Sequence, residues 1–493
     1  MEKRKTPVMG WASWNCFRTN IDEEKIKRQA DALINTGLAE YGYEYLNIDD
    51  GFFGGRDEQG KIISHPVRFP NGMKAVADYI HSLGLKAGIY ADGGDNTCGF
   101  YYDSEGGNGM NVGLYGYEKQ DLEMYFTDWG YDFIKVDWCG GLRLGLDEQM
   151  QYTKIGKIID DIRRNTGKEI VYNICRWQFP GAWAAEIADS WRTGADISPV
   201  FGSVIHQIDN IKRLVKYCSP GHTNDLDMMQ LGNGMNEEEE KTHFAMWCMM
   251  SAPLMIGCDL EKIEKSTLDI LKNTELIKIN QDSACLQAYV IKEITAADGN
   301  ISGEIWIKNL GKNHSNKKAV ALLNRSDNVL NMSVKLTEAG FDGKILSIRD
   351  VCAHKDMECV DFIENDVAAH GVIVYVIESE AAHKVKDIYK SEAAEDSRDM
   401  TVTLEQAKQL VKNGACLVDV READEYLKKH IENSINVPYT DIHAIAGDFL
   451  KDKNADIIVY CMTGKRSFQA KQSLDYLGYK NVYFLGGLGE LLC

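Results

Sequence analysis

Short apolar runs alternate with amphipathic stretches from residue 8 to about residue 260 of the chain. Such alternation is typical of strands and helices that build a parallel sheet. Eight runs spread over about 250 residues predict a closed (β/α)₈ barrel, a TIM barrel. The expected strands are Met9–Ser13, Tyr43–Asp49, Lys86–Asp92, Asp132–Trp138, Glu169–Cys175, Ser190–Asp196, His222–Asp227 and Pro253–Asp259.

The pattern changes to a period of two between about residue 285 and residue 378. Alternating apolar positions with almost no helical spacing indicate an antiparallel β-sandwich. The clearest runs are Gly303–Lys308, Lys318–Leu323 and Gly371–Ile377. The sequence therefore predicts a barrel over residues 1–284 and a sandwich over residues 285–378.

The remainder of the chain returns to α/β order after a polar stretch. Residues 379–400 lack a core pattern and predict a linker, with a short docked helix as the alternative. Residues 401–493 predict a small independent α/β domain. Its expected elements are a helix at Leu404–Lys412, strands at Cys416–Asp419 and Ile457–Cys461, a helix at Ser467–Leu477 and a strand at Asn481–Leu485.

Carboxylates gather at the ends of the expected barrel strands. Barrel enzymes place their chemistry at the C-terminal ends of the strands, so this pattern favours an active site. The alternative is that each Asp caps the following helix, which is an equally good interpretation for Asp92 and Asp259. The strand-end residues are Asp49 with Asp50, Asp92, Asp137, Asp196, Asp225 with Asp227, and Asp259.

Lys135 and Asp137 interrupt an otherwise apolar strand at alternate positions, so their side chains point the same way. Because burying two charges without a use is costly, this pair favours a carboxylate nucleophile beside a cation that also binds a substrate hydroxyl. A structural ion pair that fills the barrel is the alternative.

Two strands later, Asp196 supplies a second carboxylate, with Arg192 four residues before it. Glycoside hydrolysis needs two carboxylates that face one bond, and Asp196 suits the acid/base role if burial raises its pKa. Arg192 and Asp196 pairing on the rim is the alternative. The adjacent Asp49 and Asp50 suit the vicinal hydroxyls of a sugar. A helix-capping turn is the alternative; a metal could also use them, but His and further carboxylates at ligand spacing are missing.

At this point the chain, from Met9 to about Ile377, resembles glycoside hydrolase family 27, the α-galactosidases and α-N-acetylgalactosaminidases. Several motifs occur in the family's order. They are Gly10–Asn15 (GWASWN), Tyr45–Asp50 (YLNIDD), Gly88–Asp92 (GIYAD), Lys135–Asp137 (KVD), Trp191–Asp196 (WRTGAD), Asn224–Met228 (NDLDM), Ile277–Asp282 (IKINQD), Ala321–Ser326 (ALLNRS) and His370–Val372 (HGV).

The resemblance implies a role for each matching residue. Asp137 is implied to be the nucleophile and Asp196 the acid/base, with Asp49 and Asp50 near the 4- and 6-hydroxyls of the sugar. The axial 4-hydroxyl distinguishes galactose from glucose, so the intact Asp49–Asp50 pair favours galactose. The other implied sugar contacts are Lys135 near the 3-hydroxyl, Arg192 near the 2- and 3-hydroxyls, and Trp11, Tyr90 and Met228 along the sugar.

The sequence departs from the family pattern at several positions near the site. Arg176 stands where the family commonly has Glu, and we hypothesise that Arg176 recognises an acidic or otherwise altered group near C2 or in the aglycone. Pairing with a surface carboxylate is the alternative. Residues 101–117 are longer than usual and rich in Gly and Asn, which predicts a loop over the site. Other departures are Phe52, Thr223 and Leu226.

The segment Tyr460–Ser467 places Cys461 at a strand end, before a Gly-containing loop, Arg466 and a helix. Loop amides and a helix N-terminus stabilise a thiolate. This segment resembles the active-site loop of rhodanese-like domains, which implies that Cys461 carries a persulfide. The alternative is an inert binding or stability module. Further matches are Asp419–Arg421, His430–Ile431, Asn436–Pro438 and Leu485–Gly487.

Composition restricts the partners and the compartment. The 493 residues carry a formal net charge of −19, which argues against nucleic acid as a partner. Neither a signal peptide nor a membrane span of roughly 20 apolar residues is evident, so we expect a cytoplasmic protein. In that compartment the 13 scattered cysteines should be mostly thiols. The family resemblance implies a Cys98–Cys139 disulfide, but we expect two nearby thiols instead.

Together these features predict a retaining exo-glycosidase. It would remove terminal α-D-galactosyl residues from oligosaccharides or small glycosides through an aspartyl glycosyl-enzyme intermediate, with no metal or organic cofactor. The alternatives are α-N-acetylgalactosaminidase or β-L-arabinopyranosidase activity, or a sulfurtransferase with a weakly active sugar-binding barrel. The exact sugar and linkage, the sulfur acceptor and the oligomeric state are left open.

Overall fold

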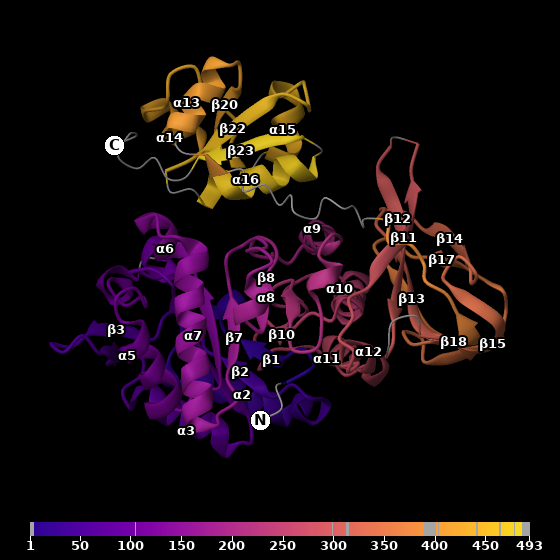
Figure 1. The fold of residues 1–493 in the computed structure, drawn as a ribbon, viewed down its shortest axis with the longest axis horizontal. Helices are drawn as coiled ribbons and strands as arrows, with labels where there is room; N and C mark the ends of the chain where they lie inside the picture. The colour runs from indigo at the N-terminus through magenta and orange to yellow at the C-terminus, as the bar shows by residue number, and fades with distance from the viewer. Residues whose placement is uncertain are drawn as a thin grey trace. The chain divides into compact units, whose positions relative to one another are not determined.

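The computed structural model describes residues 4–103, 105–297, 299–311, 315–388, 401–402, 404–439, 442–462, 465–477 and 479–485 (Figure 1). The chain divides into two compact units, Met1–Ala394 and Glu395–Cys493. Along the described parts of the chain, no helix combines the length and the apolar character needed to cross a membrane.

Eight parallel strands form the central sheet of the larger unit, in the order β10-β1-β2-β5-β6-β7-β8-β9. A parallel bridge between Met229, just after β9, and Ile256 of β10 closes the sheet into a barrel. The predicted (β/α)₈ fold is therefore confirmed. The strands are β1 (Met9–Ala12), β2 (Tyr45–Asn47), β5 (Lys86–Asp92), β6 (Phe133–Asp137), β7 (Val171–Ile174), β8 (Ser190–Arg192), β9 (Thr223–Asp225) and β10 (Leu254–Ile256).

Helices connect these strands, and several begin at side-chain caps. The Asp22 carboxylate accepts the Lys25 N–H at 2.7 Å, and Asn236 forms a capping box with Glu239. The helices of the barrel are α1 (Trp14–Phe17), α2 (Glu23–Asn35), α3 (Gly72–Ser82), α4 (Cys98–Tyr102), α5 (Glu118–Glu123), α6 (Cys139–Leu144), α7 (Glu148–Thr166), α8 (Ala184–Ile187), α9 (Phe201–Ile211), α10 (Glu237–Met250), α11 (Lys265–Leu271) and α12 (Thr274–Asn280).

The connections after β2 and β5 contain structure that the sequence pattern did not predict. A short antiparallel hairpin, β3 (Phe53–Arg56) with β4 (Ile62–Ser64), follows the Asp49–Asp50 pair. The expected loop over residues 101–117 includes the end of α4 and a 3₁₀ turn at Gly106–Gly109. Ion pairs hold it, including Arg18–Asp103 at 2.7 Å and Arg68–Glu105 at 2.8 Å.

The antiparallel β-sandwich follows the barrel, as predicted, in the same compact unit. Its six-stranded sheet has the order β11-β12-β13-β18-β15-β16, and β14 pairs with β17. Strand β18 continues four residues past the expected end of the sandwich at residue 378, because its last residues pair with β15. The strands are β11 (Tyr289–Thr295), β12 (Ile301–Asn309), β13 (Lys317–Asn324), β14 (Leu330–Lys335), β15 (Phe341–Asp350), β16 (Lys355–Met357), β17 (Phe362–Val367) and β18 (Val372–Ala382).

Buried charges fix the sandwich to the barrel. The Lys308 ammonium of β12 is fully buried and donates to the Cys248 carbonyl oxygen at 3.0 Å and to the Ser251 hydroxyl at 2.8 Å. Arg325 pairs with the buried carboxylate of Glu304 at 2.9 Å, and Lys212 of the barrel pairs with the same carboxylate. An isolated buried charge is costly, so this network makes the docked arrangement specific.

The smaller unit has a five-stranded sheet in the order β19-β23-β22-β20-β21. Its five expected elements are all present, so the predicted α/β fold is confirmed. The described residues do not include Gly486, Gly487, Cys493 or most of the expected linker. The elements are β19 (Thr401–Val402), α13 (Leu404–Lys412), β20 (Cys416–Asp419), α14 (Ala423–Lys428), β21 (Ile435–Asn436), α15 (Ile442–Phe449), β22 (Asp456–Tyr460), α16 (Lys465–Tyr476) and β23 (Asn481–Leu485).

Candidate active site

Lys135 connects two of the predicted site carboxylates. Its ammonium nitrogen lies 2.9 Å from Asp49 Oδ2 and 3.5 Å from Asp137 Oδ2. Burial would lower the pKa of this ammonium, but the two carboxylates outweigh burial and hold the pKa well above its ordinary value. The charged Lys135 side chain thus forms ion pairs with one carboxylate just after β2 and one at the end of β6.

Asp137 is the last residue of β6, and only 4% of its surface is exposed. Burial raises the pKa of its carboxyl above the ordinary value, while the Lys135 charge opposes the shift. The charges of Asp49 and Asp196 add to the raising effect, so Asp196 lies within electrostatic reach of Asp137. Lys135 is therefore the group that favours the ionised, nucleophilic form of Asp137.

Asp196 lies after β8 and leaves 37% of its side chain exposed. Burial of Asp196 was the condition for its acid/base role in the sequence analysis, and the structure leaves this residue exposed. Arg192 Nη2 lies 3.3 Å from Asp196 but only 2.7 Å from Asp227 Oδ2. The Arg192–Asp196 pair, which was the alternative interpretation of these residues, is thus the longer of two contacts. Asp227 was named among the strand-end carboxylates, but the sequence analysis assigned it no role in the site.

Asp49 and Asp50 are held by hydrogen bonds with neighbouring backbone and hydroxyl groups. The Ser13 hydroxyl accepts the Asp49 N–H at 2.9 Å, and the Gly99 N–H donates to Asp50 Oδ2 at 2.6 Å. A Cβ at position 99 would lie 2.7 Å from that oxygen, so glycine is required there. Burial raises the pKa of Asp50 to about 7, against hydrogen bonds from Thr97 and Gly99.

The aromatic residues of the site are Tyr90 and Trp14. The Lys135 ammonium lies 5.5 Å from the centre of the Tyr90 ring and 5.9 Å from that of Trp14. Trp11, also predicted to line the sugar, is fully buried, and its indole donates to the Cys258 carbonyl oxygen at 2.7 Å. Both tryptophans belong to the GWASWN motif, but Trp11 lies on β1, whereas Trp14 lies beyond the strand end in α1.

Arg176 follows β7 and is 5% exposed. Its guanidinium forms an ion pair with Glu148, the first residue of α7. Pairing with a carboxylate of the chain was the alternative interpretation of Arg176 in the sequence analysis. The structure shows such a pair, with Arg176 itself buried. A substrate carboxylate is therefore not needed to neutralise Arg176.

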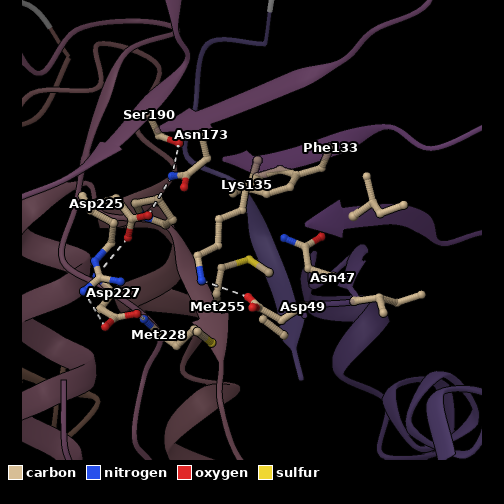
Figure 2. A pocket seen from close by; sticks show the side chains of 16 residues that line it. Asn47, Asp49, Phe133, Lys135, Asn173, Ser190, Asp225, Asp227, Met228 and Met255 are labelled. Atoms are coloured by element: carbon tan, nitrogen blue, oxygen red, sulfur yellow. Dashed lines mark hydrogen bonds and ion pairs between the residues drawn. The ribbon is translucent and has the colours of Figure 1, made fainter. Parts of the chain in front are cut away.

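The barrel interior contains a small cavity of about 40 Å³, lined by polar side chains and by apolar ones such as Val8, Phe133 and Met255. Figure 2 shows the Lys135 ammonium directed at Asp49, and Asn173 bonded to both Ser190 and Asp225. Asp49, Lys135, Arg192 and Met228 are the predicted site residues that line it. The bonds of Asn173 join strands β7, β8 and β9 inside the barrel.

A disulfide joins Cys98, the first residue of α4, to Cys139, the first residue of α6. The expectation of two free thiols is corrected, since the Cα atoms are 5.4 Å apart and the sulfurs are bonded. The backbone N–H of Cys98 also donates to the Tyr90 hydroxyl at 3.2 Å. The disulfide thus links the start of α4, which bonds the Tyr90 hydroxyl, to the segment that follows Asp137.

In the smaller unit, Cys461 follows β22 and is buried. Its sulfur accepts the Ser467 N–H at 3.4 Å, as expected for a thiol at a helix N-terminus. Arg466 is ion paired with Glu425, at 2.9 Å for Nη2 to Oε1. Thr463 and Gly464 of the predicted loop lie outside the described residues.

The larger unit brings together a buried carboxylate, a second and more exposed carboxylate, and cations flanked by further carboxylates at the C-terminal face of a (β/α)₈ barrel. This fold and site define a glycoside hydrolase.

Comparisons with known proteins identify the family. Residues 6–282 match the family model described as Alpha galactosidase A, residues 302–377 match its C-terminal beta sandwich domain, and residues 403–490 match the rhodanese-like domain. An alpha-galactosidase of Oryza sativa subsp. japonica is 38% identical over 76% of this chain and 85% of its own length. Alpha-galactosidase A of Cellvibrio japonicus is 37% identical over 75% and 91%.

The crystal structure of alpha-galactosidase I from Mortierella vinacea superposes with a TM-score of 0.68 and 30% identity, covering 77% of this chain and 98% of that one. The chain therefore belongs to the alpha-galactosidase family, and it carries a rhodanese-like domain after the family's barrel and sandwich.

Proposed function

We propose that the barrel hydrolyses terminal α-D-galactosyl residues of oligosaccharides or small glycosides with retention of configuration. One observation supports this most strongly: the Lys135 ammonium lies between Asp49 and Asp137. We infer that a sugar whose hydroxyls bind Asp49 and Lys135 presents its anomeric carbon to Asp137. Binding and chemistry are thus coupled through a single cation.

In the proposed reaction, Asp137 attacks the anomeric carbon and forms a glycosyl ester while Asp196 protonates the departing oxygen. Asp196 then takes a proton from water, which attacks the ester and releases galactose. The partly exposed position of Asp196 suits this role, because the group must exchange protons with a leaving group and with water.

Hydrolysis of four nitrophenyl glycosides tests the proposal: the α-galactoside, the α-N-acetylgalactosaminide, the β-L-arabinopyranoside and the α-glucoside. We expect turnover of the α-galactoside with α-galactose as the first product by NMR, and loss of turnover by at least 1,000-fold in Asp137→Asn. Preference for another sugar, or β-galactose as first product, would contradict the proposal.

A second function is favoured by Cys461 beside Ser467 and Arg466. We propose that Cys461 accepts sulfur as a persulfide and passes it to a thiol or another nucleophile. We expect thiosulfate to persulfidate the wild-type chain and not Cys461→Ser, with galactoside hydrolysis equal in both. Equal persulfidation of the wild-type chain and of Cys461→Ser would overturn the assignment of Cys461.

We further propose that the enzyme works in a reducing, cytoplasmic compartment on imported galactosides. Ten described cysteines outside the disulfide support this proposal, because free thiols are readily oxidised in an oxidising compartment. The Cys98–Cys139 bond is the feature that favours an oxidising compartment instead. Location of a tagged chain by cell fractionation tests it, and recovery from an exported fraction would contradict it.

A further inference from the structure

Three buried side chains that the proposed hydrolysis does not use meet behind the active site. They are Asp92 at the end of β5, Cys98 at the start of α4 and Cys139 at the start of α6. A carboxylate oxygen of Asp92 and the two sulfurs all lie within 4.8 Å of one another. Their exposed fractions are 0%, 6% and 2%.

The two oxygens of Asp92 differ in their hydrogen bonding. Oδ1 accepts the Gly94 N–H at 2.7 Å and the Gly140 N–H at 3.0 Å. Oδ2 is buried without a hydrogen-bond partner among the described residues. A buried polar atom without a partner costs free energy, so this oxygen is available to a ligand that binds beside the sulfurs.

We propose that Asp92, Cys98 and Cys139 form a binding site for Zn²⁺ or a similar thiophilic divalent cation once the disulfide is reduced. Two thiolates and one carboxylate are typical zinc donors, and water fills the fourth position of the tetrahedron. Tetrahedral bonds of about 2.3 Å place the sulfurs about 3.8 Å apart. The Cα atoms of the two cysteines are 5.4 Å apart, and we expect rotation of their side chains to give that separation without a change in the backbone.

Metal can bind only after a reductant, such as a dithiol, has reduced the Cys98–Cys139 disulfide. The reductant transfers two electrons and two protons to the Cys98–Cys139 bond and becomes a disulfide itself. Burial raises the pKa of the Asp92 carboxyl well above its ordinary value, so binding of the cation displaces to solvent both thiol protons and any proton held by Asp92. The site is therefore closed to metal in the oxidised chain and open to it in the reduced chain.

The position of the site gives metal binding a structural consequence. Helix α4, which begins at Cys98, supplies the Gly99 N–H to Asp50 and the Cys98 N–H to Tyr90. Cys139 follows Asp137 by two residues. A cation bound here would link the start of α4 to the segment after Asp137, as the disulfide does in the oxidised chain.

Metal titration of the full-length chain tests the proposal without any activity measurement, so its outcome is independent of the proposed hydrolysis. The chain is reduced with a phosphine, freed of reductant and titrated with Cd²⁺, whose thiolate charge-transfer absorbance reports binding. Competition with Zn²⁺ then gives the zinc affinity. We expect one more tight equivalent in the reduced wild type than in Cys98→Ser/Cys139→Ser.

Three controls keep this result decisive. Cys352→Ser/Cys359→Ser removes two cysteines elsewhere and should retain the extra equivalent, and the oxidised wild type should lack it. The near-isosteric Asp92→Asn should bind at least tenfold more weakly. Equal uptake by the reduced wild type and the Cys98→Ser/Cys139→Ser variant, equal uptake by oxidised and reduced wild type, or unchanged affinity in Asp92→Asn would overturn the proposal.

Discussion

The Arg192 guanidinium lies 2.7 Å from the Asp227 carboxylate, closer than the 3.3 Å that separate it from Asp196. The same Asp227 oxygen accepts the N–H of Ile197, the residue after Asp196, at 2.9 Å. Asp227 thus holds both Arg192 and the loop of the proposed acid/base, and it does so with a backbone φ of 82°. This conformation is costly for a residue other than glycine, so the surrounding contacts must enforce it.

Asp227 is therefore predicted to be a positioning residue. In Asp227→Asn, Arg192 should move its charge toward Asp196 and lower the pKa of that carboxyl. We expect kcat/KM for the α-galactoside to fall about tenfold and the alkaline limb of its pH profile to shift to lower pH. The matched control Asp259→Asn changes another strand-end carboxylate, bonded to Gln29 at 2.8 Å, and should keep the profile. A uniform loss with no shift of the alkaline limb would mean that Asp227 only supports folding.

The two tryptophans of the GWASWN motif should separate in function. Trp14→Phe should raise KM severalfold with little effect on Tm, because the ring lies beside Lys135 at the partly exposed rim. Trp11→Phe should lower stability by about 1–3 kcal/mol, because the Cys258 carbonyl loses its buried donor. Steady-state kinetics and thermal unfolding of both variants measure the difference. The reverse assignment of effects would restore Trp11 to the sugar site.

Asp50 predicts a pH dependence of stability. Its pKa is about 7 in the folded chain, above the ordinary 3.8, so the folded state binds more protons between these values. The contribution of Asp50 is therefore fully present below pH 3.8 and is lost as pH rises through 7, by at most about 4 kcal/mol. In Asp50→Asn, the fall in Tm between pH 5 and pH 8 should be smaller than in wild type. An equal fall in both proteins would show that Asp50 is ionised throughout.

The Arg176–Glu148 ion pair predicts a structural role for the departure from the family pattern. Arg176→Gln should destabilise the chain by about 1–3 kcal/mol by leaving Glu148 without its partner, and Arg176→Gln/Glu148→Gln should recover part of the loss. Thermal unfolding of the double-mutant cycle measures this coupling. The preference for the α-galactoside over the α-N-acetylgalactosaminide should not change. An altered preference in the double variant would support recognition of a group near C2 by Arg176.

The sequence predicted those parts of the site that strand periodicity determines. Lys135 and Asp137 stand at alternate positions of one strand, so their shared direction follows from the chain alone. The Arg192–Asp227 contact could not be predicted in this way, because it joins residues 35 positions apart through the barrel's curvature. The different positions of Trp11 and Trp14 could not be predicted for a similar reason. The motif does not tell which ring lies on the strand and which lies beyond its end until the end of β1 is located. The extension of β18 past residue 378 depends on pairing with β15, and the polar residues Glu378–Glu380 give no apolar pattern that would predict it.

The central claim is that Asp137 forms a covalent bond with the anomeric carbon of an α-galactosyl substrate. An activated fluorosugar of the α-galactose configuration traps such an intermediate, and peptide mass spectrometry locates it. We predict one galactosyl label per chain, on the Asp137 carboxylate, and none in Asp137→Asn. A label on another carboxylate, or turnover that continues in Asp137→Asn without a trapped sugar, would contradict the account.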